Sequence, residues 1–290
     1  MIDTSLIQLL PPIRRARGDR LYANERHWVD LWKQSGAWLL GHRPEGAARE
    51  WKNQLDKGLA AVLPSRWTAR LETHLNDLLG YGEAKGTLRL YANEESAVQA
   101  LEAWGGETFT FQDAKRARWL PFSGDDPPGL GNYPKLAKSP WKGVVLPRLP
   151  AGPATAFPVI LGPKLNVVGD LPPAPLVAVT EAAALVRAAV TLRRKQGDAN
   201  FLAALTAVGK QFDRHASQLG FFRRSGPWFE ATCEPEDYER LFTTFLEAGF
   251  VLSPDQDQES VLPPELSEGE WKAFRTAGEK FLADTGPGGS

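Results

Sequence analysis

Residues 87–97 read Thr-Leu-Arg-Leu-Tyr-Ala-Asn-Glu-Glu-Ser-Ala. The first five residues, 87–91, predict a short strand. Apolar residues recur at helical spacing over 93–104, and Gly105-Gly106 would end that helix. The stretch therefore predicts a strand that leads through a tight turn into a helix.

The segments on either side alternate between strand and helix patterns. Upstream, residues 20–32 alternate as in a β-hairpin, and apolar stripes predict helices over 49–59 and 65–79. Downstream, the pattern predicts helices over 175–195 and 200–219, a strand over 228–233, a helix over 235–248, a strand over 250–252 and a helix over 267–282.

Two of these helices begin at residues that suit a cap. Ser65 precedes an apolar stripe and can accept a hydrogen bond from the first free backbone N–H groups. Ser267 and Glu270 have the spacing of a capping box. Both helix starts are therefore predicted from side chains that can cap the first free backbone N–H groups of the helix.

The middle of the chain has a different composition. From residue 105 to 171 Pro and Gly recur, and short apolar runs lie at 143–149 and 156–161. This pattern predicts two or three short strands in a loop-rich region.

Composition narrows the class of protein. The 290 residues include 34 Lys plus Arg and 35 Asp plus Glu, which gives a net charge of -1 and no electrostatic basis for binding nucleic acid. The longest apolar run, 174–190, contains charged residues, so no membrane span is expected. The start of the chain lacks the pattern of a signal peptide, and we expect a soluble, cytoplasmic protein.

Cysteine and histidine point to no chemistry of their own. The single cysteine, Cys233, excludes an internal disulfide and lies in a strand-like run, so a buried structural thiol is expected. The 4 histidines are scattered without the spacing of metal ligands, which predicts no metal site.

Three blocks of the sequence resemble the class III pyridoxal-phosphate-dependent aminotransferases, and in particular the glutamate-1-semialdehyde aminomutase branch. The first block spans 15–42 and ends in Leu40-Gly41-His42, the second spans 63–97, and the third spans 236–254 with the closing helix. Together they cover about two-thirds of the chain in the order that the family shows. Within the Leu-Gly-His turn, His42 is interpreted as a structural hydrogen-bonding residue.

This resemblance implies an α/β protein with a reduced large domain of the PLP-transferase fold type I and an α+β small domain. Relatives in this family are dimers, and tryptophans exposed by a reduced large domain would need covering, so we expect a homodimer. The resemblance implies that residues 1–60 are an N-terminal segment that contributes to the small domain, and that 61–195 form the reduced large domain with its loop-rich middle. Residues 196–284 would form the C-terminal small domain, and 285–290 a disordered tail.

The resemblance also indicates where a cofactor would bind. In this family the phosphate of pyridoxal phosphate lies on a helix N-terminus, in a Ser-Gly-Ser/Thr-Glu-Ala turn. The matching residues here are 93–97, Asn-Glu-Glu-Ser-Ala. Glu94 and Glu95 favour the helix dipole but repel a phosphate, whereas Asn93 and Ser96 are the candidate phosphate contacts.

Lys164 is the candidate for the lysine that such enzymes join to the cofactor. It lies in Leu-Gly-Pro-Lys-Leu, 161–165, which faintly resembles the family's Leu-Gly-Lys turn. The gap to Pro175-Leu176, which resembles the family's later Asn-Pro-Leu helix start, is too short. The arginine that binds a substrate carboxylate in many relatives has no counterpart in 260–264.

Three functions follow as hypotheses. The leading one is a degenerate, non-catalytic aminotransferase-like protein, a scaffold or ligand-binding homodimer that holds no cofactor. The first alternative is a divergent pyridoxal-phosphate aminotransferase or aminomutase that uses Lys164, Asn93 and Ser96. The second alternative is a protein-interaction module with an aromatic-rich surface. The sequence names neither a ligand nor a partner.

Overall fold

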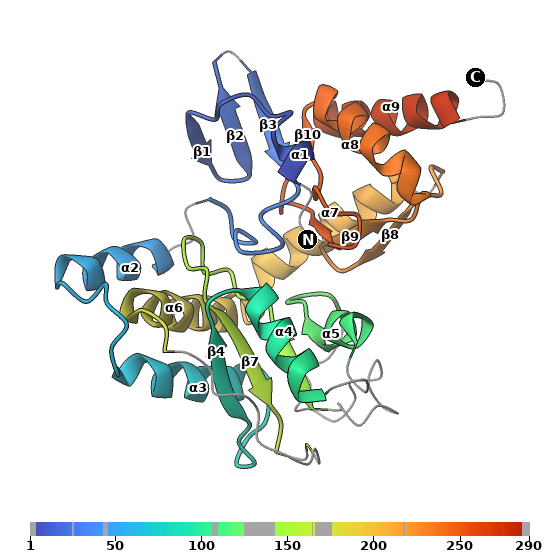
Figure 1. The fold of residues 1–290 in the computed structure, drawn as a ribbon. Coiled ribbons are helices and arrows are strands. Elements are labelled where there is room, and N and C mark those ends of the chain that lie inside the picture. The colour runs from blue at the N-terminus through green and yellow to red at the C-terminus, as the bar shows by residue number, and fades with distance from the viewer. Residues whose placement is uncertain are drawn as a thin grey trace. The chain divides into compact units, whose positions relative to one another are not determined.

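The computed structural model describes residues 4–24, 26–42, 46–105, 110–124, 143–163, 165, 176–216 and 218–285. The chain divides into two compact units. The terminal unit comprises Met1–Arg43, Phe122–Gly124 and Lys195–Ser290, and the central unit comprises Pro44–Pro121 and Asp125–Arg194. Each unit contains helices and sheets, so the chain is a mixed α/β protein (Figure 1).

Two small sheets lie in the terminal unit. The first has the order β1 (Arg15–Arg17), β2 (Arg20–Ala23), β3 (Arg26–Asp30) and β10 (Phe250–Val251). β2 is antiparallel to both β1 and β3, whereas β10 pairs with β3 in parallel. The second sheet is antiparallel and has the order β11 (Ser260–Val261), β9 (Trp228–Ala231) and β8 (Phe222–Ser225). Segments near the two ends of the chain therefore share one sheet.

Helices pack around an aromatic core in the same unit. They are α1 (Thr4–Ile7), α7 (Ala199–Ala216), the 3₁₀ turn η4 (Pro235–Asp237), α8 (Tyr238–Glu247) and α9 (Glu268–Thr285). The ring centroids of Phe212 and Phe229 lie 4.9 Å apart, and those of Phe245 and Phe274 lie 4.9 Å apart. Buried aromatic rings that pack in this way contribute both apolar area and ring–ring attraction. The core therefore joins α7, α8 and α9 to β9.

The central unit is built on one mixed sheet. Its strands have the order β4 (Thr87–Tyr91), β7 (Phe157–Leu161), β6 (Val144–Pro147) and β5 (Arg118–Trp119), and only β5 and β6 are parallel among these described pairs. The helices are α2 (Ala47–Asp56), α3 (Arg66–Leu78), α4 (Glu94–Gly105), α5 (Phe111–Ala117) and α6 (Val179–Gln196), which crosses the boundary between the units. α4 packs against β4 and β7, and α5 packs against β6 (Figure 1).

Most of the predicted local elements are confirmed. Residues 87–91 form β4, and α4 follows after two residues. Ser65 Oγ accepts a hydrogen bond from Trp67 N at 3.3 Å. Ser267 Oγ accepts one from Glu270 N at 3.2 Å, while Ser267 N donates to the Glu270 carboxylate at 2.8 Å, which completes the capping box.

Other elements differ from the prediction. α5 was not predicted, although Thr110 and Asp113 form a capping box at its start. α6 begins at Val179, whereas the sequence predicted a start at residue 175; residues 166–175 lie outside the described ranges. The predicted disordered tail, 285–290, also lies outside them except for Thr285.

Single-residue expectations gave mixed outcomes. Tryptophans in the described part of the chain are buried or half-buried, and none of these is exposed. The described tryptophans therefore give no reason to expect a dimer, and the homodimer stays an expectation from the family resemblance. Cys233 is half-buried, and its burial raises the pKa of the thiol above the usual value.

No helix in the described ranges has the length and apolar character needed to cross a bilayer.

Candidate functional site

The first turn of α4 contains the residues predicted to contact a phosphate. Asn93 directly precedes the helix, and its side-chain oxygen accepts hydrogen bonds from Ser96 N at 2.8 Å and Ser96 Oγ at 2.7 Å. An asparagine in this position satisfies a backbone N–H group that the helix leaves unpaired. Asn93 and Ser96 are thus brought together, and they bond to each other.

Glu94 accepts hydrogen bonds from two arginines. Arg118 Nε lies 3.0 Å from Glu94 Oε1, and Arg148 Nη2 lies 2.8 Å from Oε1 and 2.7 Å from Oε2. The side chains of Arg118 and Arg148 are only 5% and 8% exposed, whereas that of Glu94 is 20% exposed. Charge-assisted hydrogen bonds of this length between buried groups are among the strong ones in proteins.

The central sheet explains how the two arginines meet. Arg118 is the first residue of β5, and Arg148 directly follows β6. β5 and β6 are parallel neighbours, and Arg148 N donates to Trp119 O at 3.1 Å. Adjacent strand ends therefore bring both guanidinium groups to the first turn of α4. We call Arg118, Arg148 and Glu94 the triad.

The triad could not be predicted from the sequence because its members lie far apart in the chain. Glu94 was predicted only as an acidic residue of the first helical turn, which would repel a phosphate. One signal was available: Arg148 lies in the apolar run 143–149, and a charged residue in such a run requires a partner if the run is buried. Sequence spacing alone does not identify that partner as Glu94.

The first turn of α4 does not fit the phosphate of pyridoxal phosphate. The positive charge of the triad's two arginines is already directed at the Glu94 carboxylate, and the Ser96 N–H group already donates to Asn93. Lys164, the candidate for the cofactor lysine, lies outside the described residues. We therefore derive no chemistry from the cofactor.

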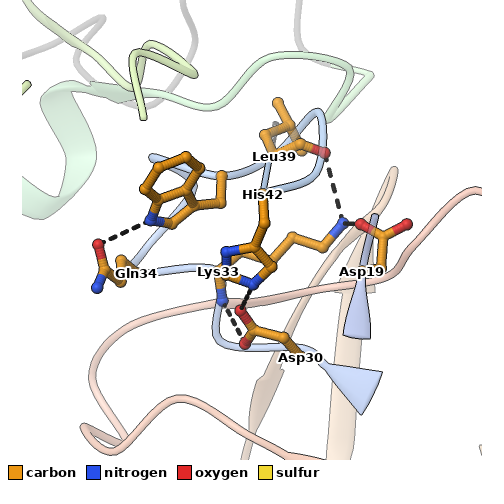
Figure 2. Close-up of polar contacts among 7 residues, drawn as sticks. Asp19, Asp30, Lys33, Gln34, Leu39 and His42 are labelled. Atoms are coloured by element: carbon orange, nitrogen blue, oxygen red, sulfur yellow. Dashed lines mark hydrogen bonds and ion pairs between the residues drawn. The ribbon is translucent and has the colours of Figure 1, made fainter. Parts of the chain in front are cut away.

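A second charged cluster lies in the terminal unit, at the end of β3. Lys33 Nζ lies 2.6 Å from Asp19 Oδ1, and the lysine side chain is 1% exposed. Asp30, also buried, accepts a hydrogen bond from Lys33 N at 2.9 Å. Its other oxygen lies 2.8 Å from His42 Nε2. Figure 2 shows these side chains pointing toward one another.

This second cluster holds an unusual turn. Lys33, Gln34 and Ser35 have φ angles of 46°, 45° and 54°, and Gly36 follows at 94°. Left-handed conformations are costly for residues other than glycine, so surrounding contacts must hold them. The interpretation of His42 as a structural hydrogen-bonding residue agrees with its contact to Asp30. The Lys33 amine, engaged by Asp19 and by Leu39 O at 3.4 Å, is not a free nucleophile.

The described residues contain no group of three His, Cys, Asp or Glu side chains arranged to hold a metal ion. Among the ion pairs of the described residues, those of the triad and of the Lys33 cluster include nearly buried side chains.

Comparisons by sequence identify no family. No family model matches the sequence. Uncharacterized proteins of Borreliella burgdorferi and Treponema pallidum are 24% and 26% identical to it, over 95% and 90% of this chain and 93% and 92% of theirs.

Solved structures of similar fold are aminotransferases. An omega-transaminase from Sphaerobacter thermophilus has a TM-score of 0.60 at 14% identity, covering 94% of this chain and 91% of its own. An N-acetylornithine aminotransferase from Stenotrophomonas maltophilia has a TM-score of 0.59 at 16% identity, covering 97% of this chain and 99% of its own. The chain thus has an aminotransferase-like fold, and a likeness at this identity carries no activity with it.

Proposed function

We propose that this chain is a non-catalytic protein of aminotransferase fold, a scaffold or ligand-binding homodimer without pyridoxal phosphate. In this proposal it descends from the glutamate-1-semialdehyde aminomutase branch of fold type I. Segments 1–60 and 196–284 contribute to the small domain in this proposal, although residues 44–60 lie in the central unit of the structure, and 61–195 form the reduced large domain. The observation that carries the proposal is the pairing of Glu94 with Arg118 and Arg148.

Glu94 disfavours a second anion at the first turn of α4. The Glu94 carboxylate already receives hydrogen bonds from both triad arginines. At an effective dielectric constant of about 20, two like unit charges about 4 Å apart repel by about 4 kcal/mol. A phosphate dianion beside Glu94 would meet this repulsion, and it would have to compete with the carboxylate for the two arginines.

Visible absorption tests the proposal. Pyridoxal phosphate joined to a protein lysine gives an absorption band that the free cofactor lacks, and the purified chain should show no such band after incubation and desalting. A stable band, lost in a Lys164→Ala variant, would instead support a working enzyme.

One observation favours that alternative, a divergent aminotransferase or aminomutase. Asn93 directly precedes α4 and Ser96 is in its first turn, where the resemblance expects the phosphate turn. For either side chain to contact a phosphate, the hydrogen bond between them would have to open. Aminotransferase activity with amino-acid donors, abolished by Ser96→Ala and Lys164→Ala, would establish this alternative.

A further inference from the structure

We infer that a cleft between the end of α2 and the start of α3 binds a medium-chain aliphatic carboxylate, with the chain against Leu63 and the carboxylate at Lys57 and Arg66. The cleft lies entirely within the central unit. Naming this class of ligand deepens the proposed function and rests on its ligand-binding form.

The connection between α2 and α3 exposes a continuous apolar segment (Figure 1). Residues 60–64, Ala-Ala-Val-Leu-Pro, are all exposed, and Val62 and Leu63 are 55% and 44% exposed. The backbone of the segment is held in place, because Val179 N donates a hydrogen bond to Ala61 O at 3.2 Å. Runs of exposed apolar residues usually mark a binding surface. We therefore expect an apolar group to cover this segment.

A cleft of about 330 Å³ borders the exposed segment. Its volume is at the small end of the range that ligand pockets occupy, and this favours a single aliphatic chain over a larger ligand. The apolar residues that line the cleft are Leu59, Leu63, Pro64, Trp67 and Val179. An aliphatic chain bound there would remove apolar surface of both the ligand and the protein from water.

The charge of the cleft is positive. Its lining includes Lys57 and Arg66, and none of the described lining residues is acidic; Asp56 precedes Lys57 but does not line the cleft. Within the part of the chain that the structure describes, neither cation has a carboxylate partner, and the Arg66 guanidinium lies over the ring of Trp67, 5.8 Å from its centroid. Lysine and arginine bind carboxylates through charge-assisted hydrogen bonds. The ligand should therefore combine an apolar chain with an anionic head group.

A second copy of the same surface fits this cleft less well. In a symmetric contact each patch faces its own counterpart, so Lys57 and Arg66 of one copy would approach the same cations of the other. An anionic ligand meets no such repulsion, and the charge of the cleft thus favours the carboxylate.

The experiment titrates the natural chain with octanoate, kept below the concentration at which it forms micelles, by isothermal titration calorimetry. We expect one saturable site per chain. Octanol lacks the charge and octylammonium reverses it, so each should bind at least about tenfold more weakly than octanoate. Acetate has the head group without the chain and should give no detectable binding. These arms require no variant.

Two pairs of variants locate the site. Lys57→Met with Arg66→Met removes both cations of the cleft, and Arg49→Met with Lys52→Met is the matched control, since it removes two exposed cations of α2 that do not line the cleft. Leu63→Ser tests the apolar wall, with Leu202→Ser, at an exposed leucine of α7, as its control. We expect the cleft variants to bind octanoate at least about tenfold more weakly, and the controls within about twofold of the natural chain.

Other results would overturn the inference. They are the absence of a saturable site, equal binding of octanoate and octanol, and equal losses in the cleft variants and their controls. Dissociation of a dimer by Leu63→Ser, without octanoate binding to the natural chain, would assign the segment to a second copy and likewise overturn it.

Parallel incubation of the natural chain with pyridoxal phosphate separates this inference from the proposed function. Octanoate binding without a lysine adduct supports both. A lysine adduct formed to one equivalent per chain contradicts the proposed function. A chain that forms no adduct and binds no octanoate contradicts only the inference, because the scaffold form of the proposed function needs no ligand.

Discussion

Arg148 Nη2 lies 2.7 Å from Glu94 Oε2, although the two residues are 54 positions apart in the chain. The contact ties the first turn of α4 to the end of β6, and Arg118 adds the end of β5. In this chain, the turn that corresponds to the phosphate-binding turn of the class III aminotransferases therefore contains the Glu94 carboxylate, which is held by two arginines.

The triad should contribute to stability because its arginines are buried. Arg148→Met removes the hydrogen bond and the ion pair of Arg148 Nη2 with Glu94, and we expect the free energy of unfolding to fall by about 2 kcal/mol. Arg193→Met is the control, since Arg193 and its partner Asp77 are 59% and 48% exposed and such a pair contributes well under about 1 kcal/mol. Urea unfolding measures both, and equal losses would contradict a stabilising role for the triad.

The buried pair of Lys33 and Asp19 should show energetic coupling. Asp19→Asn leaves a nearly buried ammonium without its carboxylate and should destabilise the fold by about 2 kcal/mol. In a Lys33→Met background the same change should cost at least about 1 kcal/mol less, because no charge is left unpaired. A double-mutant cycle by urea unfolding measures this coupling. Strictly additive losses in the free energy of unfolding would show that Lys33 and Asp19 are not energetically coupled.

The left-handed turn after β3 should not tolerate a side chain at Gly36. A Cβ atom there would overlap the ring of Trp228, which is buried, and the φ of +94° adds backbone strain. We expect Gly36→Ala to cost more than about 2 kcal/mol. Gly58→Ala has a φ of +74° but meets nothing within 4 Å, so its cost should be strain alone, about 1 kcal/mol. A similar loss for both variants in thermal unfolding would refute the packing argument.

Stability at alkaline pH should depend on Tyr81. Burial raises the pKa of its phenol from 10.0 to about 12, and among the described residues its hydroxyl has no hydrogen-bond partner. Between these two values the unfolded chain ionises first, so the stability that Tyr81 contributes is complete below pH 10 and is lost as pH rises towards 12.

Tyr81→Phe removes that ionisation. It should leave stability at pH 7 within about 1 kcal/mol of the natural chain, and its free energy of unfolding should fall less steeply above pH 10, by up to about 1.4 kcal/mol per pH unit. Urea unfolding at several pH values between about 9 and about 11.5 measures how the free energy of unfolding of each protein changes with pH. Parallel slopes for the two proteins would rule out a buried phenol at this position.

Local patterns predicted the elements whose causes are local. Ser65 and the Ser267–Glu270 capping box mark helix starts through side chains that bond to their own first turn. The alternation in 87–91 gave β4 because its buried residues face the core of the central unit. By contrast, α5 is short and lies in a region where Pro and Gly frequency dominated the pattern.

The site was predicted only in part, for a physical reason. Asn93 and Ser96 were located at the start of a helix, yet their mutual hydrogen bond depends on the turn's own geometry. The pairing of Glu94 with Arg118 and Arg148 depends on β5 and β6 being parallel neighbours, which no spacing in the sequence reveals. Lys164 stays a prediction, since it lies outside the described residues.

Borohydride trapping tests the central claim most directly. The natural chain is incubated with pyridoxal phosphate, reduced with borohydride, digested and mapped by mass spectrometry. Because Glu94 holds the charge of Arg118 and Arg148, we expect only scattered, substoichiometric labelling of surface lysines. One lysine labelled to one equivalent per chain, Lys164 above all, would contradict the claim that this protein has lost its cofactor chemistry.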